Sequence, residues 1–118
     1  MGYRKLQIYE RSYQAALEIY RMTKGFPGTE KFALASQMQR ASTSIALNIA
    51  EGYAKKSSQE EFKRFLMMAL GSANEMSVLL DFSKDLGYIT ESEYEKASKE
   101  YDEIGKMLSK FVQTISRA

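Results

Sequence analysis

The sequence contains no cysteine and no histidine among its 118 residues. Without cysteine the chain has no disulfide, no thiolate nucleophile and no Cys-based metal site. Without histidine it lacks the side chain that most often serves as a general base or a metal ligand. The segment Gly25-Phe26-Pro27-Gly28 is not a phosphate-binding loop, because the required Lys-Ser/Thr does not follow it. We therefore expect a protein that is not an enzyme and that holds no cofactor and no metal.

Long apolar runs are also missing. No stretch approaches the roughly 20 apolar residues that a membrane-crossing helix needs, and the first residues, MGYRKLQIYERSY, are polar from the outset. The sequence thus predicts neither a membrane span nor a secretory signal, and a cytoplasmic location.

The composition is that of an ordinary folded protein. Hydrophobic residues make up 44% of the chain and charged residues 27%, which is unlike a disordered tail. A chain of this length suits one domain over residues 1–118, with enough material for a modest core.

Apolar residues recur at helical spacing in four segments, separated by short breaks. The first segment runs from Leu6 to Gly25, the second from about Glu30 to Tyr53, the third from the Ser57–Glu61 region to Leu86-Gly87, and the fourth from Thr90 to Ile115. No strand-like alternation is present, and the single proline falls in the first break. The pattern predicts an all-α protein, an antiparallel up-down four-helix bundle.

Several residues carry more local predictions. Thr29 is placed to cap the second segment, Ser57 with Glu60 or Ser58 with Glu61 to cap the third, and Thr90 with Glu93 to cap the fourth. Gly71 lowers helix propensity in the third segment, so we expect it to pack closely against small residues of the second. The methionines, including Met67 and Met68, are expected to fill the core.

The second segment carries two stripes side by side. One stripe is apolar. The other is polar, repeats the same helical spacing one position earlier in the chain, and consists of Gln37, Arg40, Ser44, Asn48 and Glu51. The polar stripe is either a solvated face or a contact surface. Small neighbouring residues favour a contact surface.

Charge is unevenly divided along the chain. Residues 1–64 hold 11 Lys/Arg and 6 Asp/Glu, whereas residues 65–118 hold 6 and 9. Such a split is typical of a basic surface for a polyanion, or of two solvated faces with no further role.

These residues together resemble a known family. The order Phe26-Pro27, Ser36-Gln37, Arg40-Ala41, Asn48-Ile49-Ala50-Glu51-Gly52-Tyr53, Glu61-Phe62, Gly71-Ser72 and Leu86-Gly87-Tyr88-Ile89 is similar to the four-helix-bundle proteins encoded within intervening sequences of bacterial 23S ribosomal RNA genes. Accessory variability proteins of diversity-generating retroelements belong to the same family. The resemblance implies a ring of identical copies, most often a pentamer, and in the retroelement branch binding to reverse transcriptase and nucleic acid. Many members have proline where this chain has Ala46.

Two functions fit the residues and the resemblance. The first is an oligomeric nucleic-acid or ribonucleoprotein accessory that binds RNA or DNA phosphates without reading sequence, through Lys55, Lys56, Lys63, Arg64, Arg4, Lys5 and Arg11. The second is a structural protein–protein assembly module with no nucleic-acid role. In that case an interhelical or intersubunit hydrogen-bond network would consist of Gln37, Arg40, Asn48, Glu51 and Glu75.

Overall fold

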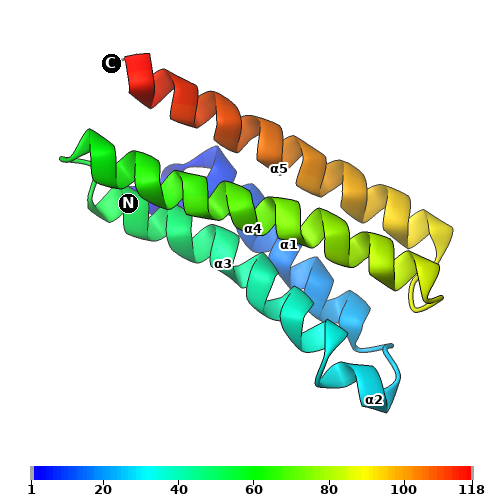
Figure 1. Ribbon diagram of the computed structural model, residues 1–118. Helices are drawn as coiled ribbons and strands as arrows, with labels where there is room; N and C mark the ends of the chain where they lie inside the picture. The colour runs from blue at the N-terminus through cyan, green and yellow to red at the C-terminus, as the bar shows by residue number, and fades with distance from the viewer. Residues whose placement is uncertain (1, 118) are drawn as a thin grey trace.

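The chain folds into helices joined by short turns (Figure 1). The structure is a computed structural model that describes residues 2–117, apart from the side chains at positions 31 and 117. Within that range it contains no strand, which confirms the predicted all-α class. The elements in chain order are the 3₁₀ turn η1 (Gly2–Lys5) and the helices α1 (Gln7–Thr23), α2 (Gly28–Lys31), α3 (Leu34–Ala54), α4 (Gln59–Asp85) and α5 (Glu91–Arg117).

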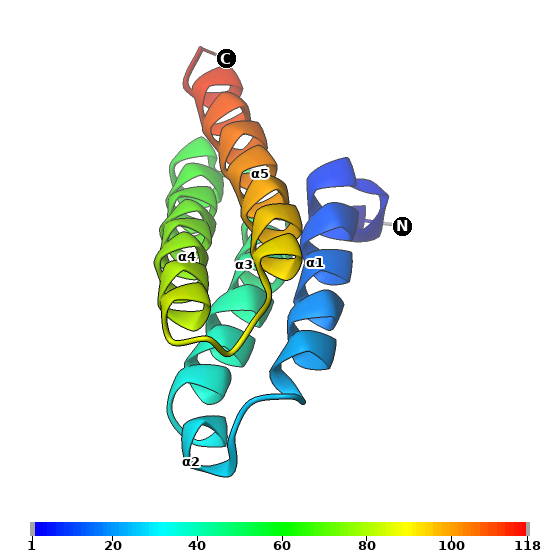
Figure 2. The ribbon, with the colours of Figure 1, turned by 90° about the vertical axis from the view of Figure 1, so that its right-hand side faces the viewer.

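The four long helices lie side by side in a rod of 46 × 21 × 21 Å (Figures 1 and 2). Helix α3 packs against α1 and α4, and α5 packs against α4, whereas α1 and α5 make the weakest contact of the four neighbouring pairs. Successive contacts between α3 and α4 show that these two helices run in opposite directions: Ser83 bonds Met38, Ser72 bonds Ser44, and Phe65 touches Gly52. The α1–α5 side is consequently the loosest side of the rod.

One hydrophobic core runs through all four long helices. Each contributes apolar residues from a single face, as amphipathic helices do. The most deeply buried are Ile19 of α1, Met38, Ile45 and Ile49 of α3, Leu66, Met76 and Leu80 of α4, and Ile104 and Leu108 of α5.

The ends of α4 and α5 follow the predicted capping chemistry. The Ser58 Oγ accepts a hydrogen bond from the backbone N–H of Glu61 at 3.2 Å, so the second of the two predicted pairs caps α4. At α5 the bonding is reciprocal: the Glu93 N–H donates to Thr90 Oγ1 at 3.0 Å, and the Thr90 N–H donates to the Glu93 carboxylate at 2.8 Å. Gly87, with φ of +80°, ends the α4 segment in a conformation that glycine adopts most easily.

The second predicted segment is divided in two, which corrects its expected start at Glu30. The short helix α2 ends at Lys31, and α3 begins only at Leu34. Between them Ala33 has φ of −109° and ψ of −88°, outside the helical region. Thr29 lies inside α2 and caps nothing, since Pro27 occupies the N-cap position and makes no side-chain cap bond.

Two expectations about α4 are also wrong. Gly71 faces solvent, and a Cβ added there would meet no atom within 4 Å, so no packing contact explains it. Met67 and Met68 are 50% and 46% exposed rather than in the core. The close approach between α3 and α4 occurs instead at Gly52, where an added Cβ would lie 2.9 Å from the Phe65 Cβ.

Candidate functional site: a basic end of the rod

The basic residues singled out from the sequence gather toward one end of the rod. The turn between α3 and α4, the start of α1 and the end of α5 all lie at this end (Figure 1). The nearer halves of the long helices, residues 2–14, 45–71 and 105–117, hold ten Lys/Arg and four Asp/Glu, a net charge of +6. The rest of the chain has a net charge of −4. We call the positive half the basic end.

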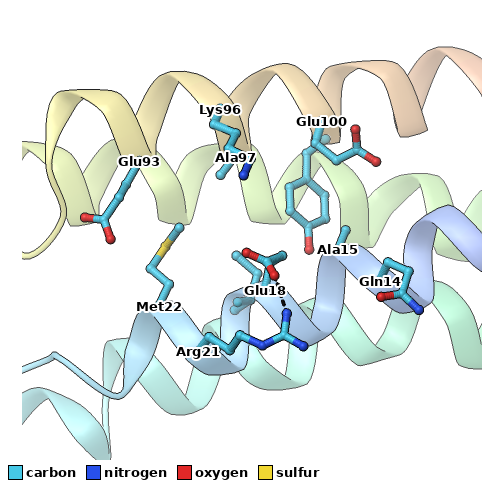
Figure 3. Close-up of a pocket in the computed structure, with 11 residues that line it drawn as sticks. Gln14, Ala15, Glu18, Arg21, Met22, Glu93, Lys96, Ala97 and Glu100 are labelled. Atoms are coloured by element: carbon cyan, nitrogen blue, oxygen red, sulfur yellow. Dashed lines mark hydrogen bonds and ion pairs between the residues drawn. The ribbon is translucent and has the colours of Figure 1, made fainter.

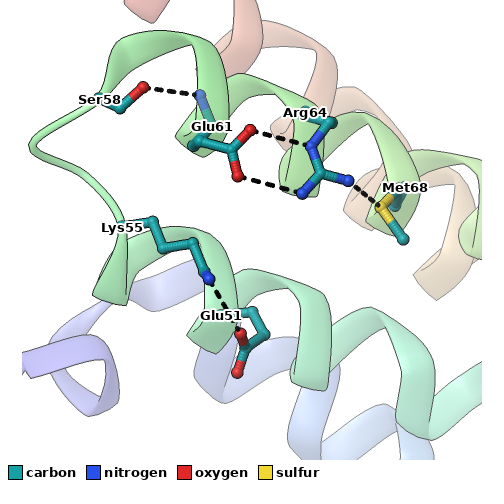
Figure 4. Close-up of polar contacts among 6 residues, drawn as sticks. All are labelled: Glu51, Lys55, Ser58, Glu61, Arg64 and Met68. Atoms are coloured by element: carbon teal, nitrogen blue, oxygen red, sulfur yellow. Dashed lines mark hydrogen bonds and ion pairs between the residues drawn. The ribbon is translucent and has the colours of Figure 1, made fainter.

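Two of its cations are partly neutralised by neighbours on their own helices (Figure 4). The Arg64 guanidinium donates two hydrogen bonds of 3.1 Å to the Glu61 carboxylate, and these bonds lower the pKa of Glu61. Lys55 lies 4.0 Å from Glu51. Both pairs are solvent-exposed, so they are weak and can be displaced by a phosphate.

Arg11 is held more firmly. Its guanidinium donates to both oxygens of Glu100, at 2.7 and 3.1 Å, and contacts the Met107 sulfur. The pair is half-buried and joins α1 to α5. Arg11 is therefore a structural contact between helices and contributes less than the other cations to a free basic surface.

The remaining candidates are open to solvent. Arg4 lies over the Tyr3 ring and Lys56 over the Tyr53 ring at 4.0 Å, geometries that position a cation without neutralising it. Lys5 and Lys63 are exposed and make no ion pair with another described residue. These four side chains can reach a polyanion without first breaking an ion pair.

Sequence reasoning missed two members of this end, Lys106 and Lys110 of α5. Both are exposed. They lie far along the chain from Lys55 and Lys56, in a half of the sequence with net negative charge. The end of α5 lies at the basic end (Figure 1) and brings them there, so the topology expected from the four helical segments was the signal that could have found them.

The predicted polar network exists in the described chain only in a reduced form. Asn48 donates to the Ser44 hydroxyl at 3.0 Å, and Ser44 bonds Ser72 of α4 at 2.9 Å. The other four members are exposed and make no side-chain hydrogen bond to another described helix: Gln37, Arg40, Glu51 and Glu75. Of these, Glu51 pairs only with its neighbour Lys55. Within the described subunit these four residues form no interhelical network, and the intersubunit form of the network stays a prediction.

Within residues 2–117 no group of three or more Asp/Glu side chains is placed to hold a metal ion.

The fold and the charge distribution define the class of protein: it is a small all-helical protein whose positive charge is concentrated at one end. More particularly, the chain belongs to the 23S rRNA-intervening sequence protein family, whose model matches residues 4–110.

A solved structure is similar to the chain. It is a protein of unknown function from the S23 ribosomal protein family of Bacteroides thetaiotaomicron, with 30% sequence identity and a TM-score of 0.82. The match covers 90% of this chain and 95% of that protein. No curated protein matches the chain.

Proposed function

We propose that this chain is the up-down four-helix-bundle subunit of a non-catalytic homo-oligomeric ring in the cytoplasm. In this proposal the ring is an accessory to RNA or DNA, and its basic end binds phosphates. The observation that carries it is the net charge of +6 on one half of the rod, drawn from segments far apart in sequence. Phosphate contacts need cations that reach outward, and Lys5, Lys56 and Lys63 do so.

Assembly would strengthen such binding. In a ring whose bundles stand parallel to the ring axis, every copy places its basic end on the same rim. A polyanion could then contact several subunits at once, which raises its apparent affinity. The repulsion between neighbouring basic ends would fall when the polyanion binds, so binding and assembly would favour each other. A pentamer is the size that family resemblance suggests, and a reverse transcriptase is the protein partner it suggests for a retroelement copy.

The test is binding to a short structured RNA at 50 and 200 mM salt, with the mass in solution followed by light scattering. We expect affinity to fall steeply with salt, since each neutralised phosphate releases counterions. The variant K55Q/K56Q/K63Q should weaken binding at least about tenfold and flatten the salt dependence.

A matched control removes three lysines from the other half, as K24Q/K84Q/K99Q. Each triplet includes one lysine stacked on a tyrosine, Lys56 on Tyr53 and Lys84 on Tyr94. Equal losses in both triplets would mean that only net charge matters and would contradict a defined basic end. Absence of binding at 50 mM salt would exclude the nucleic-acid role.

The second candidate is an assembly module without a nucleic-acid role. The observation that favours it is the apolar outer face of α4, where Val78 is 53% and Phe82 57% exposed. A chain that forms rings but ignores RNA at low salt would support this function in place of the first.

A further inference from the structure

The outward face of α4 carries several large exposed apolar side chains. Met67, Gly71, Val78 and Phe82 follow one another at helical spacing, and the three large side chains are 50–57% exposed. We call these four residues the α4 ridge. By length and apolar content alone, helix α4 could cross a membrane. Only 33% of its most apolar 18-residue stretch is buried in the subunit. Its apolar content thus exceeds what the core of this subunit covers.

Gly71 lies at the middle of the ridge and has no role within the subunit. It is in regular helix, where glycine is less favourable than alanine by about 1 kcal/mol. It does not have a positive φ, and an added Cβ would meet nothing within 4 Å. A close approach by another molecule is a physical reason for a glycine at such a position.

The α1–α5 side of the rod is hollowed. The looser packing of these helices leaves a groove of about 430 Å³ (Figure 3). Its apolar lining is formed by Ala15, Ile19, Met22, Ala97 and Tyr101. We call it the α1–α5 groove.

The groove also contains an unpartnered polar group. Tyr101 is 2% exposed, and its hydroxyl has no hydrogen-bond partner among the described residues. Burial, aided by the charge of Glu100, raises the pKa of the phenol, so the hydroxyl stays protonated and able to donate. Such a buried group normally finds a partner.

The part of the ridge that holds Val78 and Phe82 lies at the height of the groove, whereas Met67 and Gly71 lie nearer the basic end. The Tyr94 hydroxyl donates to Asp81 at 2.6 Å, which sets Phe82 of the ridge level with Glu93 at the groove. On α3, Gln39 bonds Thr23, which sets Arg40 level with Met22 of the groove. A second copy placed beside the first, parallel and without a shift along the axis, therefore brings Val78, Phe82 and Arg40 to the height of the groove.

The charges beside the two surfaces are complementary as well. Glu75 lies on the same stripe of α4 between Gly71 and Val78, is exposed, and forms no ion pair with another described residue. The groove is lined by Glu93 and Lys96, which likewise make no ion pair within the described chain. The ridge thus offers an unpaired carboxylate at Glu75, and the groove offers an unpaired ammonium group at Lys96. Two ridges facing each other would instead bring like charges together at Glu75.

We infer that Val78 and Phe82 of the α4 ridge of one copy seat in the α1–α5 groove of the next copy. The inference rests on the proposed ring and names the two surfaces that build it. Because the ridge and the groove are different surfaces, the contact is heterologous, and repetition of it forms a ring when the rotation between successive copies closes. The occupant of the groove is thus a second copy of this chain.

The experiment uses the absence of native cysteine. Two exposed positions are changed separately, V78C on the ridge and K96C at the groove, and one variant carries a tag that makes its mass distinct. We expect a disulfide-linked mixed dimer when the two variants are combined and oxidised, and little crosslinking of either alone. The matched control is D102C, an exposed position on α5 outside the groove, which should not crosslink with V78C.

The failures of the two proposals can be told apart. Light scattering of the unmodified chain first establishes whether it is an oligomer, and a monomer at all concentrations would contradict the ring itself. If the chain is oligomeric but V78C crosslinks to itself, the ridge faces another ridge, and the inference is wrong while the ring stands. An oligomer in which neither combination crosslinks would likewise overturn the inference. Circular dichroism of each variant confirms that the exposed substitutions leave the fold intact.

Discussion

Helices α4 and α5 are equally long, pack against each other, and differ on their outer faces. Both run for 27 residues and both bury apolar side chains in the same core. The outer face of α5 is charged, with Glu95, Lys96, Lys99, Asp102 and Lys106 exposed along it. The outer face of α4 carries the α4 ridge instead. Packing within the subunit explains the apolar inner faces of both helices. Because that packing does not explain the difference between the outer faces, we expect the two helices to have different surroundings outside the subunit.

The largest expected effect separates the inner face of α4 from its outer face. Leu66 is fully buried, and its neighbour Met67 is 50% exposed. L66A should lower the free energy of unfolding by about 2–5 kcal/mol, because a core cavity is left where the side chain was. M67A should change it by less than about 0.5 kcal/mol when subunits are dissociated by dilution. Urea unfolding at low protein concentration measures both.

The same pair tests what covers the ridge. If another copy packs on it, M67A should weaken assembly in light scattering although it leaves the dissociated subunit unchanged. A large loss of subunit stability in M67A would show that the outer face of α4 already has a partner within its own chain, and the contrast with α5 would disappear.

Most of the fold was predictable because it depends on local rules. Helical spacing predicted the inward residues of α5, and capping chemistry placed the starts of α4 and α5. The start of α3 was missed because Phe32 and Ala33 carry no breaker signal, yet the chain leaves helical geometry there. The outward direction of Gly71 was missed because a small residue at helical spacing is compatible with either side of a helix.

The candidate site was predictable only in part. Lys55, Lys56 and Lys63 lie close together in sequence, so their clustering was visible. The pairing of Arg11 with Glu100 and the arrival of Lys106 at the same end depend on the packing of α5. The α1–α5 groove was invisible because helices far apart in the chain form it.

A smaller effect compares the starts of the two helices. The cap of α5 has two reciprocal hydrogen bonds and that of α4 has one, at 3.2 Å. T90A should therefore cost about 1 kcal/mol of unfolding free energy, and S58A should fall at the low end of the range, about 0.5 kcal/mol. Urea unfolding of both variants checks the order, with S92A as a control that removes a hydroxyl from the same turn. A greater loss in S58A than in T90A would contradict the comparison.

An effect of similar size concerns one glycine on each helix. Gly71 of α4 has no neighbour near an added Cβ, and at Gly105 of α5 the closest atom is the Leu70 Cδ1 at 3.9 Å, an ordinary contact. Both G71A and G105A should stabilise the dissociated subunit by up to about 1 kcal/mol, since alanine has the higher helix propensity. Thermal unfolding at low concentration measures the gain.

At high protein concentration, where subunits associate, G71A and G105A should differ in assembly. Gly71 lies on the α4 ridge, and if a second copy packs along the whole ridge, an extra methyl group there would separate the surfaces and weaken the assembly. Gly105 lies outside the groove, and G105A should assemble as the unmodified chain does. If G71A assembled equally well, close approach would not explain the glycine, and the apolar outer face of α4 would have to be covered by contacts that leave room for a methyl group.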